Sequence, residues 1–169
     1  IWTRIERVID GLSLRYDKVR LYQDGLPVCG REAEIVKELA EAGSRNHQLL
    51  LRLMERGAAI MGTESPELLV EERELIQQSL AEGRAPREAE MEARRRALGN
   101  SILERRDQYI ADRISSTLAT GETGILFLGM LHSLEGRLDK GIRIVYPINR
   151  PLGGGRKRNG GGQISSSHR

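Results

Sequence analysis

The sequence has one cysteine (Cys29), few aromatic residues (4% of the chain) and no long hydrophobic run. A single cysteine excludes an internal disulfide and a zinc site built from several cysteines, and it favours a reducing compartment. No segment reaches the roughly 18 to 20 apolar residues that a membrane helix needs, and no signal peptide is visible. We therefore expect a cytoplasmic protein without a membrane partner, whose core is made of aliphatic side chains.

Several common catalytic motifs are also missing. The chain contains no HExxH, no GxGxxG, no phosphate loop ending in GK[ST] and no G-x-S-x-G. These absences exclude the usual zinc-protease helix, dinucleotide loop, phosphate loop and nucleophile elbow. We therefore expect any reactive group to be a single side chain near the end of a predicted element.

The basic excess lies near the C-terminus. The net charge is +3, and five basic residues with no acid among them occupy the last part of the chain: Arg150, Arg156, Lys157, Arg158 and Arg169. The rest is close to neutral, which makes a nucleic-acid surface on the folded part unexpected. We predict one α/β domain over residues 1–150 and a disordered Gly/Ser/Arg-rich tail over 151–169. The sequence decides neither whether the tail contacts nucleic acid nor whether the protein forms a homo-oligomer.

Hydrophobic spacing and turn residues divide the chain into alternating elements. Helices are predicted over residues 1–14, 32–42, 46–56, from Pro66 and from Ser101, where Gly99-Asn100 breaks the preceding pattern and Ser101 and Glu104 have capping-box spacing. Strands are predicted over residues 18–22, 58–62, 124–131 and 142–146. Residues 84–96 are highly charged and predict a solvated helix or a mobile segment. This alternation indicates a mixed, partly parallel central sheet flanked by helices.

Two candidate site residues lie one or two positions past predicted strands. Glu64 follows "AAIMG" and His132 follows "GILFLGML". Ligands collect at the carboxyl ends of parallel strands, so both side chains are candidates for one site. A histidine there could be a general base or a metal ligand. Alternatively, Glu64 is a carboxylate at the start of the next helix, where it interacts favourably with the helix dipole, and His132 makes only local hydrogen bonds.

The helix from Ser101 carries two further candidates. Asp107 falls within its apolar stripe and Arg106 lies at the edge of that stripe. A charged group at such a position is costly unless it is paired or faces a site opening. The pair therefore indicates either a structural ion pair near the helix start or a polar cleft over the sheet ends.

The order of these motifs over about residues 58–147 resembles the TraB/PrgY, Tiki and erythromycin-esterase-like (ChaN-like) superfamily. "ERRDQYIADRI" is similar to the helix that opens on Arg-Asn in that superfamily, with Asp107 where Asn is usual. Gly129 and His132 match its second Gly-x-x-His, and Glu64 matches a strand-end glutamate. The first Gly-x-x-His has no counterpart here. The chain begins at Ile1 in a helical pattern, so an absent N-terminal strand could carry that motif.

The resemblance implies a hydrolase-like site, of the esterase or metallopeptidase kind, acting on a small-molecule or peptide substrate. His132 would be the base or metal ligand, Glu64 its carboxylate partner and a tentative second ligand, and Arg106 an oxyanion or substrate clamp oriented by Asp107. The candidate cofactor is a divalent metal ion. The rival is a non-enzymatic domain on the same fold that binds a peptide, haem or a small anion. Side chains of Glu64 and His132 more than about 10 Å apart would favour that rival.

Overall fold

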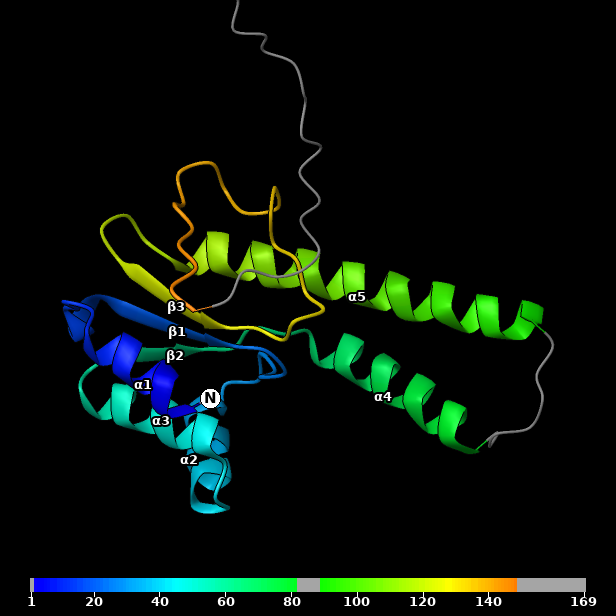
Figure 1. Ribbon diagram of the computed structural model, residues 1–169, viewed down its shortest axis with the longest axis horizontal. Coiled ribbons are helices and arrows are strands. Elements are labelled where there is room, and N and C mark those ends of the chain that lie inside the picture. Colours follow the sequence, from blue (N-terminus) through cyan, green and yellow to red (C-terminus); the bar gives the residue numbers. More distant parts are fainter. Residues whose placement is uncertain (1, 82–88, 149–169) are drawn as a thin grey trace, which may run out of the picture.

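The computed structural model describes residues 2–81 and 89–148, so the predicted tail over 151–169 lies outside the described residues. Helices and strands alternate, as an α/β fold requires (Figure 1). The elements in chain order are α1 (Trp2–Asp10), η1 (Tyr16–Lys18), β1 (Val19–Gln23), α2 (Glu32–Glu41), α3 (Arg45–Glu55), β2 (Ala59–Met61), α4 (Pro66–Ala81), α5 (Ala89–Thr117) and β3 (Thr123–Phe127).

The three described strands form a parallel sheet in the order β2-β1-β3. Leu21 of the central strand β1 pairs with Ile60 on one side and with Ile125 on the other. Leu21 and Tyr22 are both fully buried. Successive strand residues point to opposite faces, so β1 is covered on both sides, as is usual in a parallel sheet.

Helices cover the two faces of this sheet (Figure 1). One face carries a cluster of aliphatic side chains that includes Val19 and Leu21 of β1 and Leu50 and Leu53 of α3. On the other face, Tyr22 packs with Ile110 and Ile114 of α5. The turns after α2 and α3 fall at Gly43 and Gly57, both with positive φ, where the spacing predicts helix ends.

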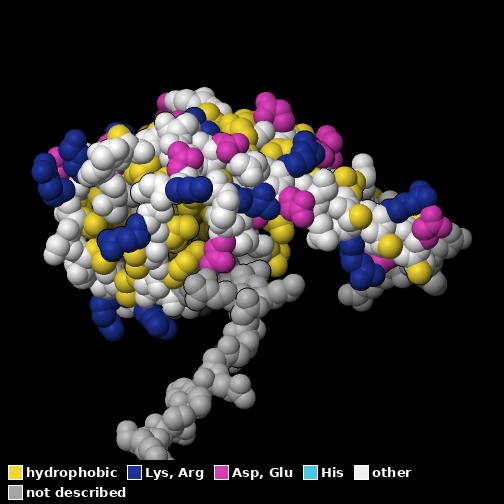
Figure 2. All heavy atoms as spheres, turned by 90° about the horizontal axis from the view of Figure 1, so that it is seen from above, with side chains coloured by type: hydrophobic (Ala, Val, Ile, Leu, Met, Phe, Trp, Pro, Cys, Tyr) yellow, Lys and Arg dark blue, Asp and Glu magenta, His cyan; other side chains and the backbone are white. Residues whose placement is uncertain are grey.

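Helices α4 and α5 extend beyond the sheet as a two-helix arm (Figure 1). Helix α4 begins at Pro66, where a helix start is predicted. The hydroxyl of Ser65 accepts a hydrogen bond from the backbone N–H of Leu68 at 3.2 Å, as an N-cap residue does. Acidic and basic side chains are interspersed on the face seen in Figure 2. Within the described part of the chain, no helix has the length and apolar character needed to cross a bilayer.

Four sequence predictions are wrong. The first helix, predicted over residues 1–14, ends at Asp10. Helix α5 runs unbroken through Gly99 and Asn100, because one glycine costs an otherwise good helix only about 1 kcal/mol. Strand β3 ends at Phe127, and the chain turns from Gly129 to His132. Residues 142–146 are described but form no strand, although their β-branched composition favours one. The charged segment forms part of α5 from Ala89, whereas residues 84–88 lie outside the described part.

Candidate functional site

The carboxyl ends of the three parallel strands bring Asp24, Glu64 and His132 together. Asp24 directly follows β1, and its backbone N–H donates to the Phe127 carbonyl at 2.9 Å. The chain after β2 stays close to the chain after β1, since the N–H groups of Thr63 and Glu64 both donate to the Leu26 carbonyl. Each segment thus leaves the sheet at the same edge, as parallel pairing dictates.

A tight turn positions His132 after β3. The N–H of His132 donates to the Gly129 carbonyl at 3.2 Å, and the N–H of Gly129 donates to Asp24 Oδ2 at 3.0 Å. A Cβ atom at Gly129 would lie 2.7 Å from that same Asp24 oxygen. Glycine at this position therefore allows the turn to approach the Asp24 carboxylate.

Asp107 on α5 holds the His132 ring in place. His132 Nδ1 lies 2.6 Å from Asp107 Oδ1, and Asp107 Oδ2 accepts the backbone N–H of Ser133 at 3.0 Å. A carboxylate only accepts, so Nδ1 carries the proton in this contact. The other nitrogen, Nε2, faces Asp24 Oδ1 at 3.5 Å. His132 is 5% exposed, so its two ring nitrogens face the carboxylates of Asp107 and Asp24 and not solvent.

Arg106 on α5 joins three carboxylates. Its Nε and Nη2 donate to the two oxygens of Glu64 at 3.2 and 2.7 Å, and Nη2 also donates to Asp24 Oδ1 at 2.8 Å. Its Nη1 donates to both oxygens of Glu72, on α4, at 2.7 and 2.8 Å. These five hydrogen bonds match the five N–H groups of a guanidinium, so Arg106 is saturated by the protein itself.

Burial and neighbouring charges shift the pKa values of the cluster. Burial raises the pKa of Glu64 and outweighs the opposing effect of Arg106. Burial also favours a higher pKa for Asp24, but His132, Glu64 and Arg106 together lower it to about 2. Burial lowers the pKa of His132, yet the carboxylates of Asp24 and Asp107 outweigh burial and raise it. Opposite shifts at adjacent carboxylates are the pattern that reactive sites use.

The three strand-end side chains could hold a metal ion. Single ligand atoms of Asp24, Glu64 and His132 all lie within 4.8 Å of one another, and Glu64 is fully buried. Two carboxylates and an imidazole make up the three protein ligands typical of a catalytic metal site. The contact of His132 Nδ1 with Asp107 is the outer-shell arrangement that leaves Nε2 for the metal.

The four residues predicted from sequence, Glu64, Arg106, Asp107 and His132, are all buried and connected in one network. Asp24 belongs to the same network but is not among the predicted site residues, because the Asp24-Gly25 pair indicates a turn. One signal could have found it: Asp24 comes just after the strand predicted over 18–22, with only Gln23 between them, as Glu64 comes just after the strand predicted over 58–62. Glu72 was also missed, and it lies within an acidic run of α4 that carries no local signal.

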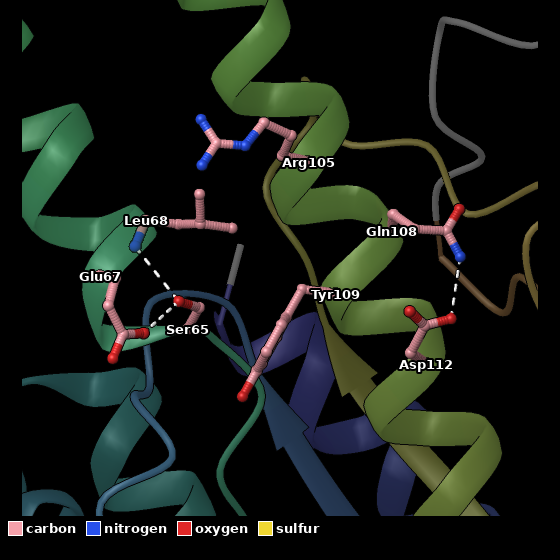
Figure 3. A pocket seen from close by; sticks show the side chains of 7 residues that line it. All are labelled: Ser65, Glu67, Leu68, Arg105, Gln108, Tyr109 and Asp112. Atoms are coloured by element: carbon pink, nitrogen blue, oxygen red, sulfur yellow. Dashed lines mark hydrogen bonds between the residues drawn. The ribbon is translucent and has the colours of Figure 1, made fainter.

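An open surface pocket of about 350 Å³ lies beside this cluster, between the start of α4 and the outer side of α5 (Figure 3). Ser65, Leu68 and Tyr109 are among the residues that line it, and Gln108 donates to Asp112 at 2.8 Å. Neither Asp24, Glu64, Arg106 nor His132 lines the pocket. We therefore place the candidate site at the network, where the ionisable groups meet.

The function of this network rests on its own geometry, because comparison with family models, curated proteins and solved structures gives no match to this chain.

Proposed function

We propose that this protein is a hydrolase that depends on a divalent metal ion held by Asp24, Glu64 and His132. The observation that carries the proposal is the convergence of their ligand atoms within 4.8 Å at the ends of three adjacent strands. In the alternative, a non-enzymatic binding domain, Glu64 and His132 need not converge, and a separation of their side chains above about 10 Å would have favoured it. The proposal agrees with the expectation drawn from the resemblance to the TraB/PrgY, Tiki and erythromycin-esterase-like superfamily.

The charge of the network supports a cation at this place. Four carboxylates (Asp24, Glu64, Glu72 and Asp107) face the single guanidinium of Arg106 and the imidazole of His132. With all four carboxylates ionised, even a protonated His132 would leave the network with excess negative charge. A buried excess of charge is costly without a counter-ion, and a divalent cation would supply one.

Each residue has a distinct part in this proposal. Asp24 and Glu64 offer oxygen ligands, His132 offers Nε2, and Asp107 fixes the ring of His132. A bound divalent cation would polarise the reacting oxygen of an ester or peptide substrate. Without metal, Arg106 holds the carboxylates together, because its N–H groups donate to Glu64, Glu72 and Asp24. The proposal therefore assigns it to the ligands and not to the substrate.

Metal titration tests this proposal. Mn²⁺, Zn²⁺ and Co²⁺ are titrated calorimetrically into the unaltered protein. The same titrations are then made with the variants His132→Ala, Asp24→Asn and Glu64→Gln. We expect one binding site, with affinity lower by about tenfold or more when one ligand is removed. Hydrolysis of ester and peptide substrates should require the same ion.

The matched control is His47→Ala. His47 lies on α3, where Ser44 contacts its Nδ1, and is outside the network. We expect His47→Ala to change neither metal affinity nor hydrolysis. The proposal would be contradicted if His132→Ala also left both unchanged.

A further inference from the structure

Arg106 divides its hydrogen bonds between two kinds of carboxylate. Asp24 and Glu64 are candidate metal ligands, and Arg106 Nη2 donates to both, at 2.8 and 2.7 Å. Glu72 is not one of the candidate ligands, and Arg106 Nη1 donates to both of its oxygens. One guanidinium therefore bridges the ligand pair and a carboxylate outside it.

The bridge places a positive charge on the oxygens that a metal would use. Both oxygens of Glu64 accept from Arg106, and so does Oδ1 of Asp24, the oxygen nearest His132 Nε2. Two cations that share the same carboxylates repel each other, most strongly where water is excluded. The Arg106 side chain is 7% exposed, so solvent screens this repulsion little.

We propose that Arg106 competes with the metal ion for Asp24 and Glu64, and that Glu72 is the positioning residue that retains Arg106 when the ion binds. This inference rests on the proposed metal site. Arg106 is the built-in counter-ion of the ligand carboxylates and stabilises the network without metal. Binding shifts its guanidinium towards Glu72, where Nη1 already donates to both carboxylate oxygens.

Glu72 is suited to this role by its place on α4. Its side chain is 34% exposed, so it adjusts to a moving partner at less cost than the fully buried Glu64. The neighbouring residues provide an internal control, because Arg105 donates to both oxygens of Glu71 at 2.8 and 2.9 Å. That second pair joins the same two helices in the same geometry, but neither of its members contacts a candidate ligand in the described network.

A double-mutant cycle on metal affinity tests the exchange. Calorimetric titration with Mn²⁺ or Zn²⁺ compares the unaltered protein with Arg106→Gln, Glu72→Gln, the double variant and Glu71→Gln. We expect Arg106→Gln to bind metal about tenfold more tightly, Glu72→Gln to bind several-fold more weakly, and Glu71→Gln to stay within about twofold. In the Arg106→Gln background, Glu72→Gln should have almost no effect, since Glu72 acts through Arg106.

The outcomes separate this inference from the proposed function. Tighter binding in Arg106→Gln supports the inference, including the case in which only that variant binds metal. Unchanged or weaker binding in Arg106→Gln overturns it while leaving the metal site in place. No binding in any protein overturns both. If Arg106→Gln does not fold without metal, Glu72→Gln decides alone: equal affinity in Glu72→Gln and Glu71→Gln overturns the role of Glu72.

Discussion

At the scale of single residues, Gly129 determines how closely the turn after β3 approaches Asp24. Its N–H donates to Asp24 Oδ2 at 3.0 Å, and a Cβ atom there would lie 2.7 Å from the same oxygen. A separation of 2.7 Å is too short for a carbon and an oxygen that are not bonded, so either the turn or the carboxylate would have to move. The site therefore requires a residue without a side chain at position 129.

We expect Gly129→Ala to destabilise the fold by about 1 to 3 kcal/mol, the usual range for overpacking, and to weaken metal affinity by displacing Asp24. Denaturant unfolding and calorimetric metal titration measure the two effects. Gly141→Ala is the matched control, because its added Cβ meets nothing within 4 Å and its φ is not positive. Equal stability of the two variants would show that the turn has room to adjust.

The residues of the network differ in how visible they are from sequence. Glu64 and His132 could be predicted because each follows an apolar run, and Asp107 because it interrupts an apolar helical stripe. Asp24 has the same relation to β1, but Asp-Gly is also a strong turn signal. Glu72 could not be predicted, because only the crossing of α4 and α5 determines which glutamate of α4 reaches Arg106.

At the scale of elements, α5 is the longest helix in the described part of the chain and links the arm to the site. It spans Ala89–Thr117 and carries Arg106 and Asp107 in its C-terminal half. Gly99 lies within it, at an ordinary helical φ, and an added Cβ would make a normal contact of 3.9 Å with Leu75 of α4. The glycine therefore weakens the helix without serving a turn.

Gly99→Ala should raise the free energy of unfolding by about 0.5 to 1 kcal/mol, because alanine loses less backbone entropy in a helix. Thermal and denaturant unfolding measure the change. For comparison, Gly121→Ala should destabilise the protein, since Gly121 has a φ of +83°. Destabilisation by Gly99→Ala would instead indicate that the helix is interrupted there, as the sequence pattern predicts.

The elements that could be predicted are those with local signals. The strand at Val19–Gln23 and the helix ends at Gly43 and Gly57 follow from alternation and turn residues. The strand expected at residues 142–146 is wrong, because a strand needs a partner as well as β-branched residues. Val145 is 65% exposed, so this segment lacks the burial that its composition favours. Strand pairing depends on residues far apart in the sequence, so a short sequence window does not show whether a partner strand exists.

At the scale of the whole molecule, an ion pair links β1 to the turn that precedes β3. Arg20 donates to both oxygens of Glu122 at 3.0 and 2.7 Å, and Glu122 also accepts the N–H of Ala119. Together these contacts tie the central strand to the end of α5. The hydrogen bond from Arg20 is the main cause that lowers the pKa of Glu122 to about 2.

This shift predicts a contribution to acid stability. The folded pKa lies below the ordinary value of 4.5, so the stabilisation is complete above about pH 4.5 and is lost as the pH falls towards 2. Glu122→Gln should lower stability at neutral pH, and the difference from the unaltered protein should shrink over that window. Urea unfolding between pH 2 and pH 7 measures it. Arg20→Gln should show the same dependence, and a difference that stays constant with pH would contradict the assignment.

The strand order β2-β1-β3 also has a consequence during protein synthesis. β1 leaves the ribosome first, yet it occupies the middle of the sheet and needs a neighbour on each side. Its partner on one side, β3, comes from the distant residues 123–127 and is translated late. Such long-range pairing slows folding, and the nascent chain must keep one edge of β1 uncovered meanwhile. Asp24 and Glu64 are translated with β1 and β2, whereas His132 follows β3, so His132 is the last of the three proposed metal ligands to be made.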